Sequence, residues 1–422
     1  MRGELPEVTP FLRLGGREWR WPTAIRALAH RNYRLFWLGQ LVSLTGTWMQ
    51  RTAQQWLVYR LTGSAFQLGL VTFASFLPVL FLAPFAGVVV DRMNKRTLVT
   101  AAQAAAMLHA GVLAALTLTG VVQLWHIVVL AFTIGVVDAF EMPARQAFVI
   151  ELTGREDLMN AIALNSSVFN GTRILGPALA GLIVAGVGEG AAFAINSLSY
   201  LAVIGGLLAM QLRPAIRSEP NGHLLDQIRG GLGYVAGHAT IRTLVGMVGV
   251  FSFFGLPYVS LIPVFAVDFL SGGPRELGLM ISSVGVGALT GALSLAAFGH
   301  VRRKGWLVTA GTLVFALSLA VFSLSRWLPL SALALAVAGW AQITQLATTN
   351  TLLQTQVSDE MRGRVMSTYT WTLSGLFPVG ALAMGALAQQ WSASTVVLAG
   401  AAVCGLFAVL VAWRLPQVRE LE

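Results

Sequence analysis

Charged residues are scarce in this sequence. Only 11% of its 422 residues are charged, whereas a soluble domain carries roughly a quarter. The single cysteine, Cys404, excludes a disulfide framework, and the histidines and cysteine lack the spacing of a metal site. Neither Lys95 nor Lys304 follows a glycine, so the chain has no phosphate-binding loop with which to pump by ATP. Without a soluble domain to hold a catalytic pair, we expect no enzyme, no metal and no cofactor.

Long apolar segments are present instead. Between Phe66 and Trp413, stretches of mostly apolar residues alternate with short polar breaks that carry arginine or lysine. A helix needs roughly 20 apolar residues to cross a hydrocarbon core while satisfying its own backbone hydrogen bonds. The pattern predicts an all-α integral membrane protein with twelve spans in the lipid bilayer. The expected spans are 35–58, 66–90, 98–118, 124–144, 161–184, 191–210, 244–266, 277–298, 306–324, 328–352, 365–387 and 395–413.

The basic residues indicate the orientation of these spans. Most of the 28 lysines and arginines lie in alternate connections and in the two ends of the chain. The opposite connections hold only Arg60, Arg275 and Arg326. Because cytoplasmic loops are enriched in basic residues, both termini are expected in the cytoplasm of a cell with this protein in its inner (plasma) membrane. The net charge of +10 therefore reflects topology, and we expect no nucleic-acid partner.

The sequence contains an internal repeat. A shift of 209 residues aligns 64–99 with 273–308 without a gap, and lays Lys95 on Lys304. Paired six-helix repeats are typical of transporters whose halves rock about a site at the membrane midplane. The expected parts are an amphipathic cytoplasmic arm at 1–33, a six-helix bundle at 34–210, a cytoplasmic linker with a surface helix at 211–243, a second bundle at 244–414 and a cytoplasmic tail at 415–422. A monomer is expected.

A polar motif ends the second span. It combines a tight exit turn with a carboxylate that is able to latch neighbouring helix ends, either through Arg145 or at the N-terminus of the eleventh span. Such a latch would act as a gate. The alternative is an ordinary basic loop that topology alone explains. The motif residues are Gly87, Asp91, Arg92, Lys95 and Arg96.

A second motif lies in the fifth span. Its small residues allow close approach to neighbouring helices, and its proline bends the helix. These residues are Gly171, Gly176, Pro177 and Gly181.

Both motifs resemble signatures of the major facilitator superfamily. The first resembles its loop 2–3 signature, although Asn94 stands where that family has glycine and His300 replaces the aspartate in the second repeat. The second resembles the glycine–proline signature of its antiporters. Residues 138–148 and 156–165 narrow the resemblance to the branch of enterobactin exporters and multidrug efflux proteins. It covers nearly the whole chain and implies two pseudo-symmetric six-helix bundles.

Four ionisable residues fall inside expected spans: Arg51, Asp138, Glu141 and Arg173. Each costs roughly 2.5–3.5 kcal/mol at a helix centre, so such residues are retained for pairing or function. At about 1.5 Å per residue, both arginines lie deeper than the acids, which argues against an Arg51–Asp138 pair. Asp138, the deeper acid, is the first candidate for proton coupling and Glu141 the second, although Glu141 is also spaced for a structural pair with Arg145. The arginines either bind an anionic group or bond to backbone carbonyls and glutamines.

The resemblance implies that spans one, four, seven and ten line a central cavity. The second half contributes no ionisable residue in mid-span, so its contacts are expected to be apolar or neutral. His109 in the third span is expected to be a packing residue. The candidates for the substrate cavity are Gln50, Arg51, Gln54, Arg173, Phe254, Tyr258, Gln342, Gln345 and Asn350.

The predicted function is secondary active transport. We expect proton-coupled antiport that exports an amphipathic small molecule, of drug or siderophore type, by alternating access, with the substrate and protons as partners. One alternative is a lipid or lysophospholipid transporter of the same fold, favoured if the cavity opens laterally. Another is a non-transporting membrane sensor or scaffold, disfavoured because nothing supplies an output domain.

Overall fold

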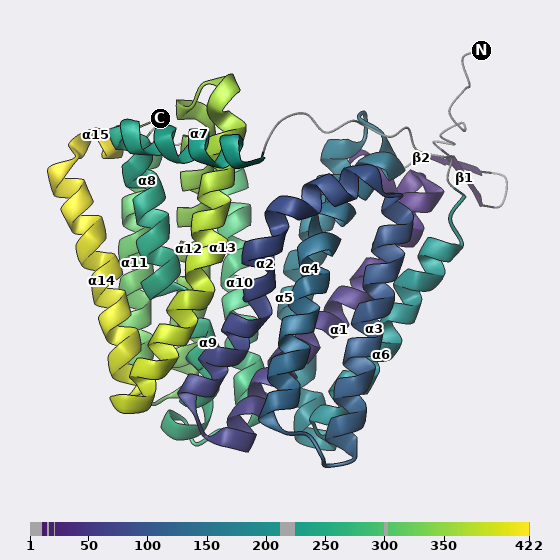
Figure 1. Cartoon of the computed structure of the whole chain (residues 1–422), viewed down its shortest axis with the longest axis horizontal. Helices are drawn as coiled ribbons and strands as arrows, with labels where there is room; N and C mark the ends of the chain where they lie inside the picture. The colour runs from purple at the N-terminus through teal and green to yellow at the C-terminus, as the bar shows by residue number, and fades with distance from the viewer. Residues whose placement is uncertain (1–10, 15–16, 21, 212–223, 299–302, 422) are drawn as a thin grey trace.

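The fold is a bundle of long helices that run between two ends of the molecule (Figure 1). The structure, a computed structural model, describes residues 11–14, 17–20, 22–211, 224–298 and 303–421. The first half contains α1 (Arg31–Thr62), α2 (Ala65–Arg92), α3 (Lys95–Leu118), α4 (Leu124–Thr153), α5 (Leu158–Val187) and α6 (Glu189–Leu208). The second contains α8 (Ala239–Val250), η2 (Phe251–Gly255), α9 (Tyr258–Val264), η3 (Phe265–Phe269), α10 (Pro274–Phe298), α11 (Lys304–Leu324), α12 (Leu328–Gln356), α13 (Asp359–Gln390) and α14 (Ala393–Arg414).

Eleven helical segments of the described chain are long and apolar enough to cross a membrane. One of them, Ala239–Phe269, combines α8, η2, α9 and η3. α1 has 32 residues and packs along α5 and α6, but Gln40, Gln50 and Arg51 make it less apolar. With α1, each half has six long helical elements, so the predicted all-α membrane fold is confirmed.

Short polar signals set the helix ends. Ser64 caps α2 by accepting from the backbone N–H of Gln67, at 3.4 Å. Asn94, the departure from the superfamily motif, caps α3 by accepting from the N–H of Thr97 at 3.1 Å. Such caps satisfy amide groups that the first turn of a helix leaves unpaired. The asparagine at position 94 thus has a local structural role as the N-cap of α3.

The segments outside the two bundles lie at the end of the molecule that carries both termini, here called the terminal end (Figure 1). α7 (Leu224–Gly237) lies across this end beside the second half, and the short α15 (Pro416–Arg419) follows α14. The expected linker therefore contains a helix, but its residues 212–223 lie outside the described residues, as do His300 and residues 1–10 of the arm.

The N-terminal arm contains a β-hairpin. β1 (Phe11–Leu14) pairs antiparallel with β2 (Arg17–Arg20), followed by the 3₁₀ helix η1 (Thr23–Ala29). The expectation of an amphipathic arm took no account of this pairing. Charged and aromatic residues alternate along the sequence at 18–21, and this alternation has the period of a strand.

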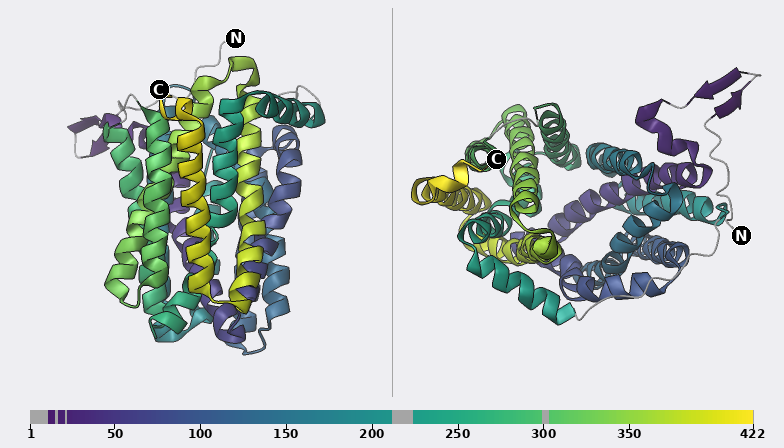
Figure 2. Two further views of the ribbon diagram at one scale, coloured as in Figure 1. Left: turned by 90° about the vertical axis from the view of Figure 1, so that its left-hand side faces the viewer. Right: turned by 90° about the horizontal axis from the view of Figure 1, so that it is seen from above.

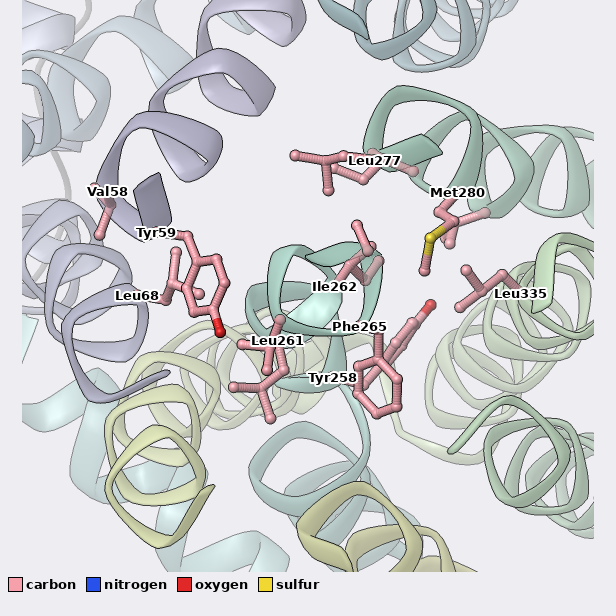
Figure 3. Close-up of a cluster of buried hydrophobic side chains, with 14 of the residues drawn as sticks. Val58, Tyr59, Leu68, Tyr258, Leu261, Ile262, Phe265, Leu277, Met280 and Leu335 are labelled. Carbon is pink, nitrogen blue, oxygen red and sulfur yellow. The ribbon is translucent and has the colours of Figure 1, made fainter. Parts of the chain in front are cut away.

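The two halves are joined at the far end, opposite the termini. One apolar cluster there contains residues of both halves (Figure 3). At the terminal end, the buried residues form two separate clusters, one in each half. Viewed from above, the helices form two groups (Figure 2, right). The described conformation is therefore closed at the far end.

Close helix contacts maintain this closure. α2 packs on α13 and α5 packs on α10. A Cβ at Gly69 would lie 2.4 Å from the carbonyl oxygen of Ala381, so this approach requires glycine. Across the same boundary, Tyr59 Oη donates to Asp268 Oδ2 at 2.7 Å, and Ser64 Oγ donates to Gln389 Oε1 at 2.9 Å.

Candidate functional site

Arg51 of α1 and Asp138 of α4 form an ion pair, with 3.3 Å between Arg51 Nη2 and Asp138 Oδ2. The expectation that their different depths argue against a simple pair was wrong. α4 continues to Thr153, so the depth of Asp138 was measured from a false helix end. Counted from the far end, Arg51 lies about 17 Å along α1 and Asp138 about 21 Å along α4. An arginine side chain bridges that difference.

This ion pair is accessible. The Arg51 side chain is 52% exposed and that of Asp138 is 37% exposed. Because α1 and α4 belong to the first half and no residue of the second half bonds to the pair in the described structure, a change in its protonation acts first on the contact between α1 and α4.

Glu141 is held more tightly. Arg145 Nε lies 3.0 Å from Glu141 Oε1, and Gln103 Nε2 of α3 donates to the same oxygen at 3.1 Å. The predicted i, i+4 pair is therefore present. Gln103 was not predicted, since a neutral residue in an apolar span carries little signal. With two donors, Glu141 is better satisfied than Asp138.

Behind this site, neutral polar side chains are buried within the first half. Gln50 Oε1 accepts from Asn196 Nδ2 at 2.7 Å, and Gln50 Nε2 lies 3.4 Å from His109 Nδ1. Gln50 is 7% exposed, so it faces the bundle interior in this conformation. His109 is also buried, as a packing residue would be. Gln54, by contrast, is half-buried.

Trp48 of α1 forms an aromatic centre for both membrane arginines. The guanidinium carbon of Arg51 lies 5.5 Å from the Trp48 ring centroid and that of Arg173 lies 5.9 Å away. Phe169 packs edge-on against the same ring at 5.6 Å. These distances are in the range of cation–π contacts. Trp48 was missed, although it precedes Arg51 by three residues and so shares its helix face.

The glycine–proline motif of α5 lies at two helix contacts. A Cβ at Gly176 would come within 2.4 Å of Trp48 Cβ on α1, and one at Gly181 within 2.8 Å of the Pro274 carbonyl oxygen of α10. Gly171 has no atom within 4 Å of such a Cβ. Pro177 lies inside the helix. The motif therefore fits α5 between α1 and the second half.

The candidates of the second half are less accessible. Tyr258 is fully buried, and its hydroxyl has no hydrogen-bond partner among the described residues. Figure 3 shows that hydroxyl pointing toward Met280 and Leu335. Gln345 is also fully buried, and its Cβ faces Gly311 of α11. Partial exposure is retained by Phe254, Gln342 and Asn350.

The loop motif after α2 is not latched in this conformation. Asp91 is exposed and makes no hydrogen bond or ion pair with any residue the structure describes. Its expected partner Arg145 bonds to Glu141. Lys95 Nζ lies 2.6 Å from Glu151 Oε1, and Arg96 Nη2 donates to the Leu208 carbonyl at 3.0 Å. Gly87 and Arg92 are exposed.

A polar clasp at the terminal end was not predicted. Asp157, between α4 and α5, accepts from Arg26 Nε at 2.5 Å and lies 2.8 Å from His30 Nε2. Asn160 bonds to the backbone of η1 through three contacts. Burial alone would raise the pKa of Asp157, but the hydrogen bonds from His30 and Arg26 outweigh it and hold the pKa below its usual range.

The described residues contain no group of three or more histidine, cysteine or acidic side chains able to hold a metal ion. The site therefore consists of a partly exposed ion pair, an aromatic ring and a second arginine, between two helical halves.

Comparison with known proteins places this arrangement in a family. Residues 22–422 match the family described as transmembrane secretion effector. The multidrug efflux pump Tap of Mycobacterium tuberculosis is 31% identical over 405 residues, which cover 90% of this chain and 93% of Tap. Macrolide efflux protein A of Streptococcus pyogenes is 23% identical over 412 residues (93% and 98%). The staphyloferrin A transporter of Staphylococcus aureus is 23% identical over 362 residues (84% and 89%).

A solved transporter structure has the same fold. The crystal structure of the nucleoside transporter NupG superposes with a TM-score of 0.71 at 12% identity, covering 90% of this chain and 98% of NupG. With the family match over nearly the whole length, these findings confirm the resemblance carried by the motifs of α2 and α5. The chain belongs to the transmembrane secretion effector family of the major facilitator superfamily, and it is a multi-pass membrane transporter.

Proposed function

We propose that this protein exports an amphipathic small molecule across the plasma membrane in exchange for protons. The ion pair of Arg51 and Asp138 carries the proposal, because it is partly exposed and a proton on Asp138 would break it. Export is supported by two relatives, which are named as a macrolide efflux protein and a multidrug efflux pump.

Alternating access follows from the arrangement of the two halves. If the basic terminal end faces the cytoplasm, the described state is closed to the outside and accepts substrate from within. Export then requires the far end to open and the terminal end to close. Opening breaks the Tyr59–Asp268 hydrogen bond, and closing brings the exposed Asp91 toward the ends of the second half.

Protonation would couple to this cycle through α1 and α4. While Asp138 is ionised, its attraction for Arg51 holds the two helices together in the conformation described. A protonated Asp138 loses that charge attraction, so the contact between α1 and α4 loosens and another arrangement of the first half becomes accessible. Glu141 is the second candidate, but its two donors leave it less free to exchange a proton.

The test is proton-driven transport by the purified protein in liposomes, with dansyl probes of negative, neutral and positive charge as transported molecules. Asp138→Asn should abolish accumulation driven by a pH gradient, while binding of the probes in detergent persists. The matched control is Asp359→Asn, because Asp359 is 87% exposed at the start of α13. Unchanged gradient-driven transport in Asp138→Asn would refute the assignment. Loss in Glu141→Gln instead would move the proton site to Glu141.

A further inference from the structure

Arg173 differs from the other ionisable residues in mid-membrane. Arg51 pairs with Asp138, and Glu141 pairs with Arg145. Arg173 lies near the middle of the 30-residue α5, about 22 Å from either end. It makes no hydrogen bond and no ion pair with any residue described in the structure. Among the described residues, Arg173 therefore does not bond to backbone carbonyls, which was one of the two alternatives for it.

The position of Arg173 is fixed by contacts across the boundary between the halves. Ser282 Oγ of α10 donates to the carbonyl oxygen of Ile174 at 2.8 Å. A Cβ at Gly285 would lie 3.0 Å from the carbonyl oxygen of Arg173, so α10 passes directly beside this turn of α5. The guanidinium group lies over Trp48 of α1. Arg173 therefore lies between the two halves and is not directed from an outer helix into lipid.

An unpaired guanidinium group at this depth is costly, because lipid and protein solvate it far less than water does. Such residues face a cavity or a partner and mark the path of a substrate or ion. Asp138 does not neutralise Arg173, since its carboxylate is engaged by Arg51. Two positive guanidinium groups thus lie around the Trp48 ring. One negative carboxylate pairs with the first of them, so the local charge is positive.

We infer that Arg173 binds an anionic group of the transported molecule, a carboxylate, sulfonate or phosphate ester whose apolar or aromatic body packs against Trp48. This inference rests on the proposed function, because it names the class of substrate for the same site. Guanidinium binds such oxyanions through two parallel hydrogen bonds. Trp48 and the edge-on Phe169 provide a flat apolar surface beside it.

An anionic substrate fits export energetically. A membrane potential that is negative inside favours outward movement of a negative charge. Inward movement of a proton is favoured by the same potential. Exchange of an anion for a proton therefore moves charge in the favoured direction in both steps.

The test uses three fluorescent probes with one fluorophore and different charges: dansylglycine (anionic), dansylglycinamide (neutral) and dansylcadaverine (cationic). Binding to the purified full chain is measured by fluorescence titration in detergent, without any gradient. The unaltered protein should prefer the anion, and Arg173→Gln should weaken anion binding by about tenfold or more while binding of the neutral probe stays the same. Arg173→Lys should retain part of the affinity. Arg275→Gln is the matched control, since Arg275 is exposed in the first turn of α10.

A second readout does not depend on the probe. Removal of an unpaired membrane charge should leave the thermal stability of the ligand-free protein unchanged or raise it. Removal of a structural arginine should lower it, and Arg60→Gln provides that reference because Arg60 Nε lies 2.6 Å from Glu189 Oε1. A fall in melting temperature for Arg173→Gln as large as for Arg60→Gln would overturn the inference. So would the absence of an anion preference in the unaltered protein.

Anionic lipid headgroups offer the same chemistry, so the titration is repeated in nanodiscs with and without phosphatidylglycerol. Loss of dansylglycine binding only in the presence of that lipid would assign Arg173 to lipid and overturn the substrate assignment. The proposed function fails separately. Anion binding through Arg173 without gradient-driven transport would refute the proposed proton exchange and leave the anion inference standing. Gradient-driven transport without anion preference would refute the anion inference and leave the proposed function standing.

Discussion

At the scale of single residues, the acids of the first half differ in what neutralises them. Asp138 has one contact of 3.3 Å with a half-exposed arginine. Glu141 has two donors, and Asp157 has an arginine and a histidine as neighbours. A carboxylate with several donors is well suited to stabilise the fold, whereas one with a single, partly exposed contact is the better candidate for coupling. This ordering separates the structural acids from the candidate for coupling.

Asp157 provides a prediction about pH. The pKa of Asp157 in the folded protein lies below the usual value of about 3.9. The ionised side chain therefore contributes to stability above about pH 3.9, and this contribution is lost as the pH falls toward the folded pKa. Asp157→Asn should lower the free energy of unfolding at neutral pH by about 1–2 kcal/mol. The difference from the unaltered protein should shrink below about pH 4. Thermal unfolding in detergent across a pH series measures both.

The control for this experiment is Glu156→Gln, the adjacent acid, which is exposed. It should leave the melting temperature unchanged at every pH. A difference between Asp157→Asn and the unaltered protein that persisted at pH 3 would show that the contact acts through packing and not through charge.

The four ionisable residues of the spans were predictable from the sequence because they are charged. Their uncharged neighbours were not. Arg51, Asp138, Glu141 and Arg173 stand out because lipid penalises them. Gln103 and Trp48 do not stand out, since a polar amide or an aromatic ring is common in a membrane helix. Their roles depend on which helix faces which, and this is set by tertiary packing that no single segment encodes.

At the scale of helices, the apolar pattern located the spans but not their ends. Hydropathy marks the part of a helix in hydrocarbon, whereas α4 continues in helical form to Thr153. That extension is why Asp138 was placed too near the helix end, which argued against a simple pair with Arg51. The hairpin at 11–20 was overlooked for a related reason, because a search for long apolar segments passes over short alternating ones.

The internal repeat could have predicted the far-end contact between α1 and the seventh span. Tyr59 and Asp268 are separated by 209 residues, the same shift that aligns the two halves. Equivalent positions of two related halves approach one another only near the axis that relates them. The hydrogen bond between these two residues therefore lies near the axis that relates the two halves.

This geometry predicts the effect of removing one hydroxyl. Tyr59→Phe removes the donor to Asp268 without changing the shape of the ring, so the closed far end should lose about 1.5–3 kcal/mol relative to the open state. Labelling of a cysteine introduced at Ala65, which is 6% exposed and lies beside this contact, should become about tenfold faster or more. Tyr369→Phe is the matched control, because its hydroxyl bonds to the Leu346 carbonyl within the second half. Equal labelling rates in the two variants would contradict the gate.

At the scale of the whole molecule, the far end is closed by packing that requires small residues. The ideal Cβ positions of Gly181 and Gly278 conflict with backbone atoms of the opposite helix, at 2.8 Å and 2.5 Å. Backbone atoms cannot move aside as a flexible side chain can. The glycine motif of α5, seen from sequence only as a likeness to antiporters, therefore has a physical purpose in bringing α5 and α10 into contact.

One motif thus contains both a test and its control. Gly181→Ala should force α5 and α10 apart at the far end, at a cost to the closed state of about 1–3 kcal/mol, as overpacking usually does. Gly171→Ala should have no such effect, because open space surrounds that position. Distances between spin labels on α5 and α10 should lengthen in the first variant only, with slower transport, since a carrier that cannot close its outer side leaks or stalls. If Gly181→Ala leaves both the distances and the transport rate unchanged, closure does not depend on this contact and the halves must be held by the apolar cluster around Tyr59 alone.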